Sequence, residues 1–166
     1  MAIESLQVFE LDDAFRQRLH ALRAGLHQVD AASLLGAAWH MRQRDPPRAL
    51  AILDEWDRRS AGAPPAGDLH GPHGASAARA QLIRAEIAWL DGDLAGAETA
   101  AAQALAAFGR CDDALGTGDC HWLRAHLAVD QGNPKQRGAE IDQAVASFQR
   151  AGDPQRVRMA QARGIY

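Results

Sequence analysis

The sequence has few of the residues that build sheets, disulfide frameworks or membrane spans. Aromatic residues make up 5% of its 166 residues, and it contains two cysteines. Two cysteines do not make a disulfide framework, so we expect reduced thiols. The longest apolar stretches, such as LLGAAW at 34–39, fall far short of a bilayer span. We therefore expect no membrane partner.

The chain also has no segment in which charges of one sign are concentrated. The net charge is −3, with acidic and basic residues interspersed. Without a basic patch there is no footprint for phosphate groups, so we expect no nucleic-acid partner. The N-terminal stretch MAIESLQVFELDDAF has early acids and no continuous apolar segment, which excludes a secretory signal and predicts a cytoplasmic protein.

Alanine is abundant, and apolar residues recur at helical spacing along nearly the whole chain. The pattern predicts an all-α protein of about eight helices. A Gly- and Pro-rich stretch over 61–75 interrupts it and predicts a surface loop. The expected helices cover about 12–28, 31–43, 46–59, 76–91, 94–109, 117–131 and 134–150, and a last one begins near Pro154.

The turns between paired helices fall at Arg44-Asp45, Gly92-Asp93 and Gly132-Asn133, which are 48 and 40 residues apart. Small residues stand where two helices of a pair would meet closely: Ala37, Ala85 and Ala125 in first helices, and Ala49, Ala97, Ala104 and Ala144 in second helices. Over residues 31–150 this pattern resembles the tetratricopeptide repeat. The match departs at Trp56 and Arg137, which stand at positions where the family has small residues.

The resemblance implies a right-handed solenoid of antiparallel helical hairpins. It divides the chain into an N-terminal helical cap, 1–30, and tetratricopeptide-like repeats over 31–166. The individual repeats would be 31–60, 76–109 and 117–150, with a further helix over 154–166. An unrelated alanine-rich helical bundle is the alternative.

The resemblance also implies a partner-binding inner face on the first helix of each hairpin. The matching positions are Arg79, Leu82, Glu86, Trp89, Asp119, Trp122 and His126. Tryptophan is frequent among binding hot spots, so Trp89 and Trp122 are the main candidates. Packing of both side chains between repeats, as part of the core, is the alternative.

Chemistry-bearing patterns are scarce, and we expect neither an enzyme nor a cofactor or metal site in this chain. His70 and His73 in HGPHG have only Asp68 beside them as a further ligand. Cys111, Cys120, His121 and His126 are spaced unlike any standard zinc site, and core or interface positions explain them better.

The expected function is protein–protein or protein–peptide interaction. The stretches ARAQLIRAEIAWLDGDLAGAE and GDCHWLRAHLAVDQGN look similar to degenerate repeats that precede diguanylate cyclase (GGDEF) domains in bacterial signalling proteins. They imply an N-terminal sensory or interaction region. The alternatives are a free-standing scaffold or chaperone-like adaptor that binds a peptide in its groove, and a sensor with a small molecule between Trp89 and Trp122.

The last helix predicts how copies could associate. We expect Val157, Ala160 and Ile165 to form an exposed apolar stripe, because no following helix would cover them. We therefore expect a longer protein, or a homodimer through the C-terminal helix, and a natural C-terminal capping helix is the alternative.

Overall fold

A computed structural model describes residues 30–61 and 72–164. These residues form seven helices and no strand, which confirms the all-helical class. The predicted helix over 12–28 lies outside the described residues, as does nearly all of the predicted cap. None of the helices in the described ranges is long and apolar enough to cross a membrane. The described helices belong to two compact units, one with α2 and α3 and the other with α4 to α8.

The first unit is a helical hairpin of α2 (Ala31–Met41) and α3 (Pro46–Ser60). Asp30 caps α2 by accepting the backbone N–H of Ser33 at 2.9 Å. Asp45 caps α3 in the same way, and prolines fill the first turn, where a missing N–H costs nothing. Both predicted helices are thus present.

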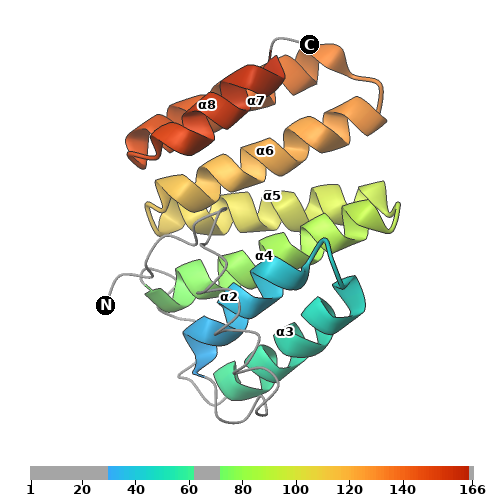
Figure 1. The fold of residues 1–166 in the computed structure, drawn as a ribbon, viewed down its shortest axis with the longest axis vertical. Helices are drawn as coiled ribbons and strands as arrows, with labels where there is room; N and C mark the ends of the chain where they lie inside the picture. Colours follow the sequence, from blue (N-terminus) through green and yellow to red (C-terminus); the bar gives the residue numbers. More distant parts are fainter. Residues whose placement is uncertain (1–29, 62–71, 165–166) are drawn as a thin grey trace. The chain divides into compact units, whose positions relative to one another are not determined.

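The second unit comprises five helices, each packed against the next one along the chain. They are α4 (Pro72–Leu90), α5 (Leu94–Arg110), α6 (Ala114–Asp130), α7 (Pro134–Arg150) and α8 (Pro154–Gly164). Figure 1 shows them as successive antiparallel neighbours, and α4 also contacts α6. Helix α4 begins four residues before the predicted 76, so the end of the predicted loop over 61–75 is helical, and Pro72 is accepted because it stands in the first turn.

One turn geometry recurs every twenty residues in this unit. Glycine has a positive φ at Gly92 (+85°), Gly132 (+67°) and Gly152 (+71°), and Asp112 (+53°) holds the corresponding place between α5 and α6. The next residue in each turn caps the following helix by accepting the backbone N–H three positions later. These caps are Asp93, Asp113, Asn133 and Asp153.

The predicted gap between a helix that ends at 109 and one that begins at 117 is therefore too long. Asp113 accepts the Gly116 N–H at 2.8 Å, and α6 begins at Ala114 rather than near 117. Gly116 and Gly118 lie within α6, where close neighbouring rings leave no room for a side chain. A Cβ on Gly116 would come within 2.3 Å of the Phe108 ring, and one on Gly118 within 2.5 Å of the Phe148 ring.

The small residues lie at helix contacts as predicted. Ala85 of α4 and Ala97 and Ala104 of α5 have no exposed surface, and α4 packs against α5. The corresponding Ala125 and Ala144 in α6 and α7 are also buried. A methyl group at these positions lets neighbouring helix backbones approach closely.

The predicted exposed stripe on α8 is wrong for the residues that can be compared. Ala160 is fully buried in a cluster with Ala144 and Phe148, and Val157 packs against the same cluster. Helix α7 covers this face, so α8 needs no following helix to bury it. Ile165 lies outside the described residues.

Candidate functional site

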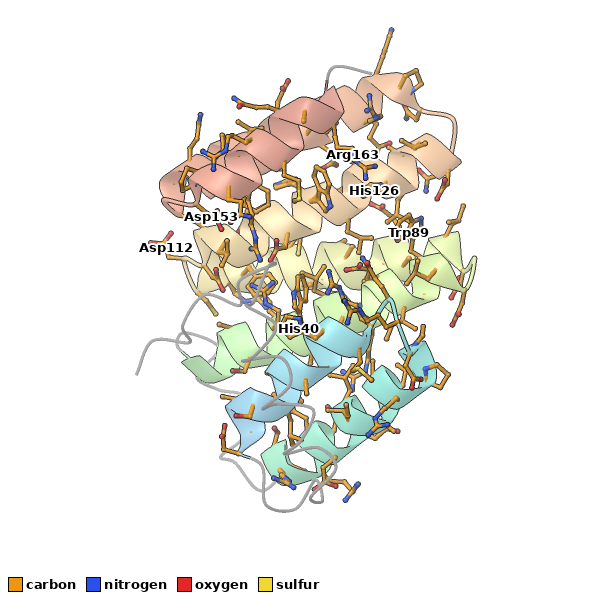
Figure 2. The ribbon with its side chains drawn as sticks, in the orientation of Figure 1. His40, Trp89, Asp112, His126, Asp153 and Arg163 are labelled. Atoms are coloured by element: carbon orange, nitrogen blue, oxygen red, sulfur yellow. The ribbon has the colours of Figure 1, made fainter. Side chains whose placement is uncertain are left out.

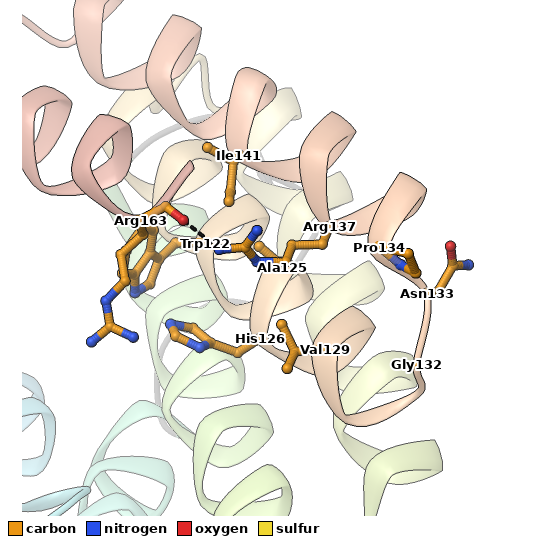
Figure 3. A pocket seen from close by; sticks show the side chains of 10 residues that line it. All are labelled: Trp122, Ala125, His126, Val129, Gly132, Asn133, Pro134, Arg137, Ile141 and Arg163. Atoms are coloured by element: carbon orange, nitrogen blue, oxygen red, sulfur yellow. Dashed lines mark hydrogen bonds between the residues drawn. The ribbon is translucent and has the colours of Figure 1, made fainter. Parts of the chain in front are cut away.

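A cavity of about 500 Å³ opens between α6, α7 and α8 (Figure 3). Its size is within the range usual for ligand pockets. Helix α6 supplies one wall, the α6–α7 turn and α7 supply another, and α8 contributes one residue. The lining residues are Trp122, Ala125, His126, Val129, Gly132, Asn133, Pro134, Arg137, Ile141 and Arg163.

The charge of this cavity comes from two arginines. Arg137 and Arg163 line it, and no aspartate or glutamate does. Arg137 donates a hydrogen bond to the backbone carbonyl of Arg163, which ties the start of α7 to the end of α8 (Figure 3). Among the ion pairs of residues 30–61 and 72–164, none includes either guanidinium. Both groups can therefore meet an anionic ligand.

Aromatic rings extend from the cavity to α4. The His126 ring lies between two indoles: its centroid is 5.1 Å from that of Trp89 and 5.0 Å from that of Trp122. The first pair is tilted by 30° and the second is edge-on at 83°. Trp89 Nε1 donates to Asp130 Oδ2 at 2.5 Å, which fixes the indole against α6. Figure 2 shows Trp89, His126 and Arg163 on neighbouring helices.

Burial and positive charge both act on His126. Burial is the main cause that lowers its pKa below 6.5, and Arg163 and Arg137 lower it further. Glu86 and Asp130 oppose these effects without cancelling them. At neutral pH the imidazole is therefore uncharged, and the cavity owes its positive charge to the arginines.

The remaining predicted inner-face residues have structural contacts. Asp119 on α6 receives Arg79 of α4 at 2.5 Å and Arg156 of α8 at 3.0 Å, and all three side chains are buried. This carboxylate thus connects three helices that alternate along the chain. Leu82 and Glu86 are also buried. Of the predicted set, the structure places Trp89, Trp122 and His126 together beside the cavity.

Sequence reasoning did not identify the two arginines as site residues. Arg137 stood out in the sequence only because the repeat family has a small residue at its position. No feature of the sequence marked Arg163 as a site residue. The twenty-residue spacing of the turns supplies the missing signal, because it places α7 in register with α5 and α8 in register with α6.

Other reactive groups in the described residues do not form a site. No group of three or more His, Cys, Asp or Glu side chains there could hold a metal ion. His70 and the side chain of His73 lie outside the described residues. Burial raises the pKa of the Cys120 thiol far above neutrality, so this cysteine is not a nucleophile at neutral pH. His121 contacts Glu140 at 2.7 Å in a network that joins α6 to α7.

No protein-family model matches the chain, and no curated protein or solved structure is significantly similar to it.

Proposed function

We propose that this chain is a non-catalytic binding module that captures a peptide segment of another protein in the cavity between α6, α7 and α8. The observation that carries the proposal is a cavity of about 500 Å³ with an apolar wall and two arginines that form no ion pair within residues 30–61 and 72–164. Val129 on its rim is 52% exposed, so apolar surface is available to a partner.

The proposed architecture is a right-handed solenoid of tetratricopeptide-like hairpins. Three observations support it: the repeated capped turns, the buried alanines at matching positions, and the packing of each helix against the next. In such an array the first helices of successive hairpins form an inner face, and Trp89, Trp122 and His126 stand on these helices.

The proposed biological setting is the sensory or interaction region of a larger bacterial signalling protein of the diguanylate cyclase type. This part rests only on the resemblance of the two stretches quoted above. A free-standing scaffold or adaptor would use the same cavity. Because Ala160 and Val157 pack against α7, we do not propose a homodimer through α8.

Blocking the cavity tests the proposal. The residue forty positions before Val129 is Trp89, so the repeat already accepts tryptophan at this register. Val129→Trp places an indole at the cavity rim, and Leu50→Trp is the control, because Leu50 is 37% exposed and lies on α3 in the other unit. Peptides are selected from a phage-displayed library of random ten-residue sequences, and their affinities are measured by calorimetry.

We expect the parent chain and Leu50→Trp to bind the selected peptides equally, and Val129→Trp to lose binding by at least about tenfold. Selection of no peptide would contradict the proposal. Equal binding by Val129→Trp, with an unchanged circular dichroism spectrum, would place the binding site elsewhere.

A further inference from the structure

The cavity can be compared with the equivalent place forty residues earlier, where α4, α5 and α6 correspond to α6, α7 and α8. Helices α5 and α7 begin forty residues apart, at 94 and 134, and α6 and α8 begin at 114 and 154. Arg137 therefore corresponds to Ala97, and Arg163 corresponds to Leu123. Ala97 is fully buried and Leu123 is 3% exposed.

The comparison shows what distinguishes the cavity between α6, α7 and α8. Two positions that are buried and apolar on α5 and α6 carry arginines forty residues later, on α7 and α8, and both arginines line the same cavity. His126 likewise stands where the preceding hairpin has Glu86. Relative to the residues forty positions earlier, the cavity therefore gains two positive charges and loses one negative charge, although the whole chain has a net charge of −3.

We propose that the ligand of this cavity is an acidic peptide segment. Its aspartate or glutamate side chains bind Arg137 and Arg163, and an apolar side chain packs against Trp122 and Ile141. The inference deepens the proposed function and rests on it. Carboxylates are the natural partners of arginine, because the planar guanidinium can donate two parallel hydrogen bonds to them.

The extent of the surface favours a peptide over a compact anion. Trp122, His126 and Trp89 form an aromatic row. Trp122 and His126 line the cavity, whereas Trp89 on α4 contacts His126 from outside the lining. Val129, with 52% of its surface exposed, lies on the rim. A ligand that covers Arg163, Trp122, His126 and Trp89 together spans three helices, as an extended peptide can.

The residues found forty positions earlier supply the variant that tests this proposal. Arg137→Ala/Arg163→Leu introduces the residues found forty positions earlier, so we expect the fold to accept it. Arg137→Gln/Arg163→Gln is a second variant that keeps polar side chains. The matched control is Lys135→Ala/Arg158→Ala, which removes two exposed cations from the same two helices without changing the cavity lining.

The full chain is used to select peptides from the random ten-residue library. We expect the bound sequences to be enriched in aspartate and glutamate and to contain at least one aromatic or large aliphatic residue. The dissociation constant of a representative peptide should rise at least about tenfold in both arginine variants. It should change less than about twofold in the control, and affinity should fall as salt is added.

Three outcomes would overturn the proposal. Enrichment of neutral or basic peptides would contradict it, as would equal affinity for the parent and the arginine variants. If neutral or basic peptides were selected and lost binding in Val129→Trp, the proposed function would stand and only the acidic ligand would be wrong. If no peptide were selected and benzoate raised the melting temperature of the parent but not of the arginine variants, the ligand would be a small anion.

Discussion

Two phenylalanine rings set the local packing of α6. Phe108 of α5 and Phe148 of α7 are both buried, and each lies against a glycine of α6. Their positions differ by forty residues, so both rings follow from the repeat. An arginine lies near each ring, with the Arg79 guanidinium 4.9 Å from the Phe108 centroid and that of Arg156 5.7 Å from the Phe148 centroid. Asp119 holds both arginines through ion pairs.

The glycines of α6 give a stability prediction. We expect Gly116→Ala to lower the free energy of unfolding by about 1–3 kcal/mol, because the new methyl group overlaps the Phe108 ring. Gly138→Ala is the control: a Cβ there meets nothing within 4 Å, and alanine should stabilise α7 by up to about 1 kcal/mol. Urea unfolding followed by circular dichroism measures both. Equal stabilisation by the two variants would show that the ring does not occupy this place.

His126 gives a pH prediction. Its folded pKa is below 6.5, so the unfolded chain binds more protons at this site than the folded chain as pH falls. The contribution of His126 to stability is therefore intact above 6.5 and decreases as pH falls through the folded pKa. The unfolding free energy of the parent minus that of His126→Gln should thus be smaller at pH 5 than at pH 8. A difference that is constant or larger at pH 5 would contradict the burial of this ring.

At the scale of the elements, the local chemistry of the turns was readable in the sequence. Glycine followed by an aspartate or asparagine cap predicted the turns at Gly92 and Gly132, where the structure has positive φ angles. The turn at Asp112 was missed because its positive-φ residue is not glycine and two glycines follow it inside α6. The Phe108 and Phe148 rings lie against these glycines, and both rings belong to the neighbouring helices α5 and α7.

The same contrast applies to the candidate site. Trp89, Trp122 and His126 could be chosen from the repeat pattern, whereas the pairing of Arg137 with Arg163 depends on how α8 lies against α7. The exposed stripe predicted on α8 failed for a related reason. Periodicity identified Val157 and Ala160 as one face but did not reveal that the preceding helix covers that face.

The register of α5 and α7 can be tested directly. Ala97→Leu should lower the free energy of unfolding by about 1–3 kcal/mol, because Ala97 is fully buried where α5 packs against α4. Arg137→Leu, forty residues later, should cost less, since Arg137 is only partly buried and borders open space. Thermal unfolding by calorimetry compares the two variants. An equal loss of unfolding free energy in the two variants would contradict a closely packed Ala97 and an Arg137 that borders open space.

At the scale of the whole molecule, the described helices belong to two compact units, and every lining residue of the cavity belongs to the unit of α4 to α8. The same unit contains the Arg79–Asp119–Arg156 network and the aromatic row. Within this unit, α5 and α6 have buried apolar residues at Ala97 and Leu123, and the equivalent positions of α7 and α8 have arginines that line the cavity. Binding specificity can therefore arise from a few substitutions on a repeated scaffold.

Exchanging the charges of the two partners tests the central claim most directly. A selected acidic peptide and its counterpart with lysine at every acidic position are titrated into the parent and into Arg137→Glu/Arg163→Glu. The account predicts that the parent binds the acidic peptide at least about tenfold more tightly, and that the variant reverses this preference. A reversal also shows that the variant remains folded. If both proteins preferred the same peptide by the same ratio, the cavity between α6, α7 and α8 would not be the place where the acidic side chains bind.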